Sequence, residues 1–332
     1  MGMETRLLRL TAGDGGTLGI LERRPRVAVA NLRPMLLLHG ATFGAAFLDL
    51  PRPGYSLMAA LAESGRTVYA LDIRGYGNSH GREAMEQPPG GNPPFAGVDE
   101  AVGDIAAAAD FILDRQGVAK LDLLGLSWGT IPAARYAGEH PQKIGCLVLY
   151  APLYGEENLA WLDRIADPQD HGRLHAKFGA YRLIALDDVV RRWDSDLPPG
   201  DPAQHRDDGL TELVFKTLAA LDPQSSSRVP PAFRCPNGAL ADLIQIFNRT
   251  PLYDPAKLTM PVLLLRGADD TTSTDSDSLR LLSRIGSRDK DYCVIAPGSH
   301  FLCIEKNRSR LYEEINRFLG QWSEATGSGE KK

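Results

Sequence analysis

The sequence lacks the features that would place it in a membrane or on nucleic acid. Nowhere in its 332 residues do about eighteen apolar residues run together, and residues 1–10 hold no apolar run of signal-peptide length. We therefore expect a cytoplasmic protein without an integral membrane segment. The 37 Lys and Arg residues are scattered and the net charge is -5, so there is no basic footprint for a phosphate backbone. Nucleic acid is not an expected partner.

Cysteine is also scarce. The four cysteines, Cys146, Cys235, Cys293 and Cys303, are widely spaced and form no CxxC pair. This pattern predicts reduced, mostly buried thiols rather than a disulfide framework or a zinc site. The acidic residues show no EF-hand spacing either. We expect no metal ion and no organic cofactor.

Hydrophobic residues make up 43% of the chain and charged residues 24%, which is enough apolar material for a large core. Two short segments, 6–11 and 17–22, flank a glycine-rich turn and predict a hairpin. Compact apolar runs typical of buried parallel strands follow at residues 35–38, 67–71, 120–124, 144–150, 261–265 and 291–295. Helix-like segments lie between them at residues 55–64, 98–116, 128–139, 277–285 and 307–322. This alternation predicts a wound α/β sheet.

The alternation stops between residues 155 and 255, a stretch with many charges and proline-rich breaks. We interpret it as a helical cap inserted into a core made of residues 1–154 and 256–322. The polar residues 323–332 are predicted to be a disordered tail.

The segment Gly125-Leu126-Ser127-Trp128-Gly129 carries the first chemical signal. It lies between an apolar strand and a helix-compatible stretch, which is the context of a GxSxG nucleophile elbow. The serine backbone is strained at such a turn, and the flanking glycines let strand and helix pack closely around it. Ser127 is therefore the candidate nucleophile.

A serine hydroxyl needs a base, and the base needs an acid to orient it. His300 follows the strand predicted over residues 291–295, and Asp269 and Asp270 follow the strand predicted over residues 261–265. Loops at the carboxyl ends of parallel strands assemble sites, so these side chains are expected to meet. The order serine, acid, histidine is that of the hydrolase elbow fold.

With these motifs the sequence resembles the α/β-hydrolase superfamily over nearly the whole chain outside the proposed cap and tail. The resemblance implies a mostly parallel eight-stranded sheet flanked by helices. The superfamily's Gly-x-x-Asp signature maps onto Gly267-Ala268-Asp269-Asp270 and favours Asp270 over Asp269 as the acid. The segment from Asp72 to Ser79 resembles an architectural turn of the superfamily, so Asp72 and Arg74 are expected to be structural.

The segment His39-Gly40-Ala41-Thr42 resembles the superfamily's oxyanion loop, and it implies an oxyanion hole made by the N–H groups of Ala41 and Trp128. His39 itself is expected to be structural. Side chains near these loops are candidates for an apolar substrate pocket, although ordinary core packing explains them equally well: Thr42, Phe43, Phe47 and Phe301.

The motifs look most like the carboxylesterase, lysophospholipase and monoacylglycerol-lipase branch. They imply a serine hydrolase that cleaves a small-molecule carboxylic ester, or a related acyl substrate, through an acyl-enzyme on Ser127. An acyltransferase, a proline-iminopeptidase-like amide hydrolase and a non-catalytic receptor remain alternatives. The iminopeptidase needs an acidic amine-binding cluster in the cap, for which Glu156, Glu157, Asp187 and Asp188 are candidates. The oligomeric state stays open.

Overall fold

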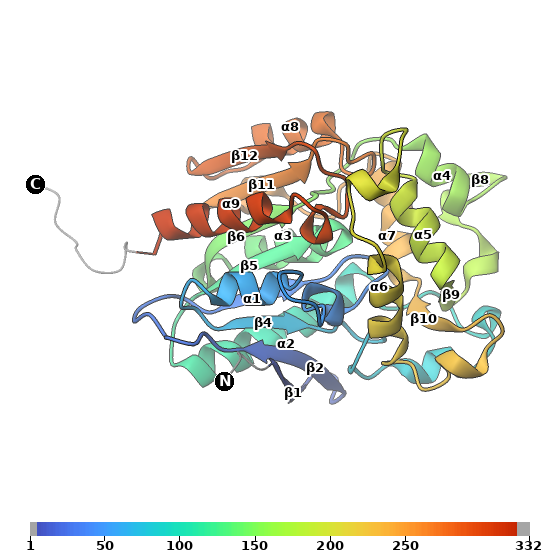
Figure 1. The fold of residues 1–332 in the computed structure, drawn as a ribbon, viewed down its shortest axis with the longest axis horizontal. Helices are drawn as coiled ribbons and strands as arrows, with labels where there is room; N and C mark the ends of the chain where they lie inside the picture. Colours follow the sequence, from blue (N-terminus) through green and yellow to red (C-terminus); the bar gives the residue numbers. More distant parts are fainter. Residues whose placement is uncertain (1–4, 324–332) are drawn as a thin grey trace, which may run out of the picture.

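Short apolar strands build one eight-stranded sheet at the centre of the molecule (Figure 1). The computed structural model describes residues 5–323. In chain order the sheet contains β1 (Thr5–Thr11), β2 (Thr17–Arg23), β3 (Met35–Leu38), β4 (Val68–Leu71), β5 (Leu121–Leu126), β6 (Ile144–Tyr150), β11 (Val262–Gly267) and β12 (Lys290–Ile295). Their spatial order is β1-β2-β4-β3-β5-β6-β11-β12.

The first two strands pair antiparallel with each other, and β2 pairs antiparallel with β4. All later neighbours pair parallel. Every residue of β3, β4 and β5 is buried, because helices cover both faces of the sheet. The predicted fold class is confirmed.

The covering helices are α1 (Leu57–Ala62), α2 (Val98–Gln116), α3 (Thr130–Glu139), α8 (Asp275–Arg284) and α9 (Arg308–Gln321). Helix α1 packs against α9, and α2 packs against α3. The ends of these helices and of the sheet strands agree with the sequence prediction to within about two residues. None of the helices within the described part of the chain combines the length and apolar character needed to cross a bilayer.

Residues 155–255, the proposed cap, gather at one end of the sheet (Figure 1). They form α4 (Leu159–Ile165), α5 (Leu186–Asp194), α6 (Leu210–Ala219) and α7 (Gly238–Phe247). They also contain two short ribbons, β7 (Ala166–Asp167) with β8 (Asp170–Leu174) and β9 (Tyr181–Ala185) with β10 (Ala232–Pro236). The segment proposed as a helical cap therefore contains strands as well as helices. Most of β8 is exposed and polar, so its sequence has no alternation that would predict a strand.

The tail predicted over residues 323–332 falls almost wholly outside the described residues, which end at Ser323.

A buried ion cluster ties the sheet together at the end of β5 opposite to Ser127. Asp122 accepts from Arg66 Nη1 at 2.8 Å and from Arg33 Nε at 2.7 Å. The side chains of Asp122 and Arg66 are only 1% and 2% exposed. Asp122 also accepts the backbone N–H of Cys146, so its desolvation is offset by three donors.

Replacing Asp122 by Ala is expected to lower the free energy of unfolding by about 3 to 5 kcal/mol, because Arg66 would stay buried without a counterion. Chemical denaturation of both proteins measures the difference. The control is Asp291→Ala, which removes a half-exposed partner of Arg317 and is expected to change stability by less than about 1 kcal/mol. Equal losses in the two variants would contradict the assigned role of the cluster.

Candidate active site

Ser127 lies in a sharp turn between β5 and α3, where a 3-10 turn (Ser127–Gly129) precedes the helix. Its φ is 55°, a left-handed value that is rare outside glycine. A Cβ on Gly125 would lie 2.4 Å from the carbonyl oxygen of Gly129, and a Cβ on Gly129 would lie 2.3 Å from that of His39. The strand, the turn and the His39 loop therefore meet at distances that only glycine allows.

Three side chains that are far apart in the sequence form one hydrogen-bonded chain. His300 Nε2 lies 2.8 Å from Ser127 Oγ, and His300 Nδ1 lies 2.8 Å from Asp270 Oδ2. An ionised carboxylate only accepts hydrogen bonds, so this network assigns the proton to Nδ1 and leaves Nε2 free to accept from the serine hydroxyl. The arrangement can draw a proton from Ser127.

Asp270 is 3% exposed and its second oxygen accepts the backbone N–H groups of Thr272 and Ser273 at 2.8 and 2.9 Å. Burial alone would raise the pKa of this carboxyl. The neighbouring His300 and the two N–H donors outweigh that effect and hold its pKa below the ordinary value. Asp270 therefore stays ionised beside the imidazole.

The neighbouring Asp269 has a different place. Its Oδ2 accepts the N–H of Gly298 at 3.0 Å, and its own N–H donates to the Gly298 carbonyl at 2.8 Å. A Cβ on Gly267 would lie 2.3 Å from the same carbonyl oxygen. Asp269 thus joins the loop after β11 to the loop after β12, whereas Asp270 faces His300.

The loop after β3 is held by a buried, neutral histidine. His39 Nε2 accepts the N–H of Ile73 at 3.2 Å, so Nδ1 carries the proton and donates to the Gly40 carbonyl at 2.8 Å. Burial lowers the pKa of His39, which agrees with this neutral tautomer. The hydrogen bond from His39 to the Gly40 carbonyl fixes the Gly40–Ala41 peptide. The N–H of this peptide, which belongs to Ala41, has no acceptor among residues 5–323.

The two predicted oxyanion donors have backbone positions suited to that task. The Ala41 N–H has no acceptor in the part of the chain that the structure describes, and the Trp128 N–H belongs to the first turn of a helix, where donors have no intrahelical partner. The Ala41 carbonyl accepts from Tyr76 Oη and from Arg182 Nη2, each at 2.9 Å. Arg182 also donates to Thr42 Oγ1 at 3.0 Å. Arg182 belongs to β9, so the proposed cap helps to hold the oxyanion loop.

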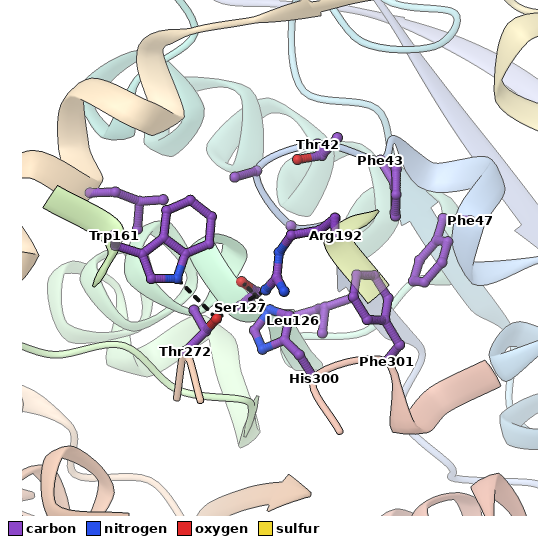
Figure 2. Close-up of a pocket in the computed structure, with 13 residues that line it drawn as sticks. Thr42, Phe43, Phe47, Leu126, Ser127, Trp161, Arg192, Thr272, His300 and Phe301 are labelled. Carbon is purple, nitrogen blue, oxygen red and sulfur yellow. Dashed lines mark hydrogen bonds between the residues drawn. The ribbon is translucent and has the colours of Figure 1, made fainter. Parts of the chain in front are cut away.

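A pocket with an empty volume of about 550 Å³, which includes its open mouth, lies over Ser127 and His300 (Figure 2). The four predicted pocket residues, Thr42, Phe43, Phe47 and Phe301, all line it. The sequence did not indicate four further lining residues: Trp161, Arg192 and Leu243 of the proposed cap, and Thr272 of the loop after β11. No motif marks these positions, and only the packing of the cap over the sheet reveals them.

Comparison with known proteins agrees with this geometry. A family model described as serine aminopeptidase, S33, matches residues 54–307. The chain belongs to this hydrolase family. The predicted membership in the α/β-hydrolase superfamily is thereby confirmed.

Solved structures resemble this S33 hydrolase along nearly its whole length. A hydrolase from Pseudomonas aeruginosa is 18% identical with a TM-score of 0.62, and the match covers 95% of this chain and 98% of that one. An esterase from Exiguobacterium antarcticum is 14% identical with a TM-score of 0.61, covering 96% and 100%. An enol-lactonase from Burkholderia xenovorans is 15% identical with a TM-score of 0.62, covering 94% and 100%. At these identities the likeness shows the fold alone.

The residue after Ser127, the proposed nucleophile of this S33 hydrolase, is anchored by a buried carboxyl group. The indole Nε1 of Trp128 donates to Asp242 Oδ2 at 2.8 Å. Burial raises the pKa of Asp242 to about 7, although hydrogen bonds from Trp128 and from the Val98 N–H oppose the rise. Asp242 therefore changes charge near neutral pH in contact with the indole of Trp128.

This titration predicts a pH-dependent stability. Between its ordinary pKa of 3.8 and about 7, Asp242 holds a proton in the folded state and loses it in the unfolded state. The folded state binds more protons in that window, so its stability falls as pH rises, by at most about 1.4 kcal/mol per pH unit.

Denaturant unfolding from pH 4 to pH 8 measures this slope in the wild-type protein and in Asp242→Asn, which cannot titrate at this position. The wild-type minus variant difference in unfolding free energy is expected to decrease with pH. The exposed control Asp291→Asn is expected to keep the wild-type slope. Parallel curves for the wild type and Asp242→Asn would refute the shifted titration.

Proposed function

We propose that this protein is a serine hydrolase that cleaves carboxylic esters through an acyl-enzyme on Ser127. The observation that carries the proposal is the continuous hydrogen-bonded chain from Ser127 Oγ through His300 to Asp270, which opens onto a pocket with largely aromatic and aliphatic walls. Membership in a hydrolase family supports it.

The geometry suits two-step acyl transfer. Ser127 Oγ attacks the ester carbonyl while His300 Nε2 takes the hydroxyl proton, and Asp270 stabilises the resulting imidazolium. The carbonyl oxygen becomes an oxyanion that accepts from the N–H groups of Ala41 and Trp128. His300 then returns its proton to the leaving alkoxide oxygen, so the alcohol departs. Water repeats the sequence on the acyl-enzyme and releases the acid.

The charges around the pocket favour an ester over a peptide with a free amino terminus. None of the four candidate acidic residues of the cap lines the pocket within the described chain. Glu156 instead accepts from Thr274 and Ser276, Glu157 pairs with Arg249, and Asp188 accepts the N–H of Ala185 at the start of α5. The lining contains a cation, Arg192, which would repel a substrate ammonium group.

The names of several similar proteins of known structure also support an acyl substrate. They include esterases, an enol-lactonase and a thioesterase domain. These names support the proposal of an acyl-oxygen or acyl-sulfur substrate, with carboxylic esters as the first class to test.

Labelling with a fluorophosphonate probe, followed by peptide mapping, is expected to give one adduct on Ser127. The variant Ser127→Ala is expected to lose the adduct and the turnover of a p-nitrophenyl ester series, because no other group takes the place of the nucleophile. Circular dichroism serves as the folding control. A folded wild-type protein without adduct or turnover would contradict the proposal and favour a receptor, and faster product formation with an added alcohol would favour an acyltransferase.

Asp270→Asn is expected to lower kcat by about 10⁴-fold, because the amide would not stabilise the imidazolium and would favour the wrong tautomer of His300. The matched variant Asp269→Asn keeps an oxygen that can accept from Gly298 and is expected to cost less than about tenfold. Steady-state kinetics on one ester measures both. A larger loss in Asp269→Asn would reverse the assignment of the acid.

A further inference from the structure

Arg192 reaches from helix α5 into the middle of the pocket, between the rings of Trp161 and Phe301 (Figure 2). Its guanidinium carbon lies 5.3 Å from the centre of each ring. The side chain is only 19% exposed. A charged group in this position has lost most of its water, and the two aromatic faces replace part of that lost interaction.

The guanidinium is fixed in place on one side. Nη1 donates to Asp196 Oδ2 at 2.7 Å, and Nη2 donates to Thr272 Oγ1 at 2.9 Å. Asp196 is itself anchored, because its other oxygen accepts from Thr271 Oγ1. The Nε–H of Arg192 has no acceptor among the described residues. Arg192 is therefore a preorganised cation that lines the pocket and keeps an N–H group that no described residue uses.

The rest of the lining makes this charge distinctive. Within the described part of the chain, Arg192 is the one Lys or Arg that lines the pocket, and no carboxylate lines it. Its counterion Asp196 lies behind it, buried to 2% side-chain exposure and outside the lining. A molecule entering the pocket therefore meets apolar walls and one guanidinium edge.

We propose that this pocket is built for a substrate that carries a carboxylate, and that Arg192 binds it. The inference rests on the proposed function, since it names the substrate class of the same site. A planar guanidinium with unused N–H groups matches a carboxylate in shape and charge. One arginine that already shares its charge with Asp196 fits a single negative charge better than the double charge of a phosphate monoester.

The position of the cation also sets the length of the substrate. A carboxylate oxygen of Asp196 lies within 4.8 Å of donor or acceptor atoms of both Asp270 and His300. Arg192 is bonded to that carboxylate, and it lines the same pocket as Ser127. The expected substrates have a short spacer between the scissile ester and the carboxylate.

Monomethyl and dimethyl esters of succinate, glutarate and adipate provide matched probes, because each pair differs by one methyl group that removes the charge. The rate of each dimethyl ester is halved to correct for its two equivalent ester groups. Acetyl esters of ω-hydroxy acids and their methyl esters place the charge on the alcohol side. Acid release in a pH-stat is expected to show, for at least one pair in either series, a kcat/KM at least tenfold higher for the charged ester. No preference for charge in any pair would overturn the proposal.

Substitutions at two adjacent arginines separate recognition from folding. Arg192→Gln is expected to lower the ratio of charged to neutral kcat/KM at least tenfold, mainly through KM, and Arg192→Lys is expected to lie between. A merely structural role would reduce both esters alike and leave the ratio unchanged, which would contradict the proposal. The control Arg191→Gln alters a side chain that is 72% exposed and pairs with Asp188, and it is expected to keep the wild-type ratio.

Binding separates failure of this inference from failure of the proposed function. Calorimetric titration of Ser127→Ala with the monomethyl esters requires no turnover. Saturable binding that is lost in Ser127→Ala/Arg192→Gln, and kept in Ser127→Ala/Arg192→Lys, supports the subsite even if the wild-type protein cleaves neither ester. The opposite result would be turnover of neutral esters by the wild-type protein and equal binding of the monomethyl esters by Ser127→Ala and Ser127→Ala/Arg192→Gln. That result would reject the carboxylate subsite but not the proposed hydrolase activity.

Discussion

The left-handed backbone of Ser127 depends on the close contact between β5, the following turn and the loop after β3. Such a conformation costs about 1 to 3 kcal/mol in a residue with a side chain. Here the fully buried strand β5 and the helix α3 hold it from both sides, and Gly125 and Gly129 leave no room for relaxation. Because Gly129 also touches the His39 carbonyl, the same crowding that strains the proposed nucleophile places the proposed oxyanion loop beside it.

The register of the sheet places the loop that holds Asp270 beside the loop that holds His300. Strands β11 and β12 run parallel with Gly267 paired to Ile295, so both chains leave the sheet at the same edge. Residues 270 and 300 could be predicted to meet because each follows shortly after an apolar strand. Neighbouring parallel strands end at the same edge of the sheet. The choice between Asp269 and Asp270 required the superfamily signature, because both side chains follow the same strand.

The structure of the proposed cap was much harder to predict from the sequence. Arg182 and Arg192 belong to the proposed cap, and both contact residues outside it. Nothing in their local sequence distinguishes them from the other arginines of the chain. The ribbon β9–β10 joins segments about fifty residues apart, a pairing that neither periodicity nor turn chemistry indicates. Motifs identified the candidate catalytic residues because each of them closely follows a strand of the sheet, whereas the shape of a pocket arises from long-range packing.

Arg182 and Arg192 lie on one continuous piece of chain, since β9 runs directly into α5. The first contacts the loop that would hold the developing negative charge, and the second contacts the space that the substrate would fill. An exchange of this segment between related proteins would therefore transfer a change in selectivity together with a change in catalytic power. Related proteins are therefore expected to acquire new substrates by single substitutions within this segment. Exchange of the whole proposed cap would change selectivity and catalytic power at once.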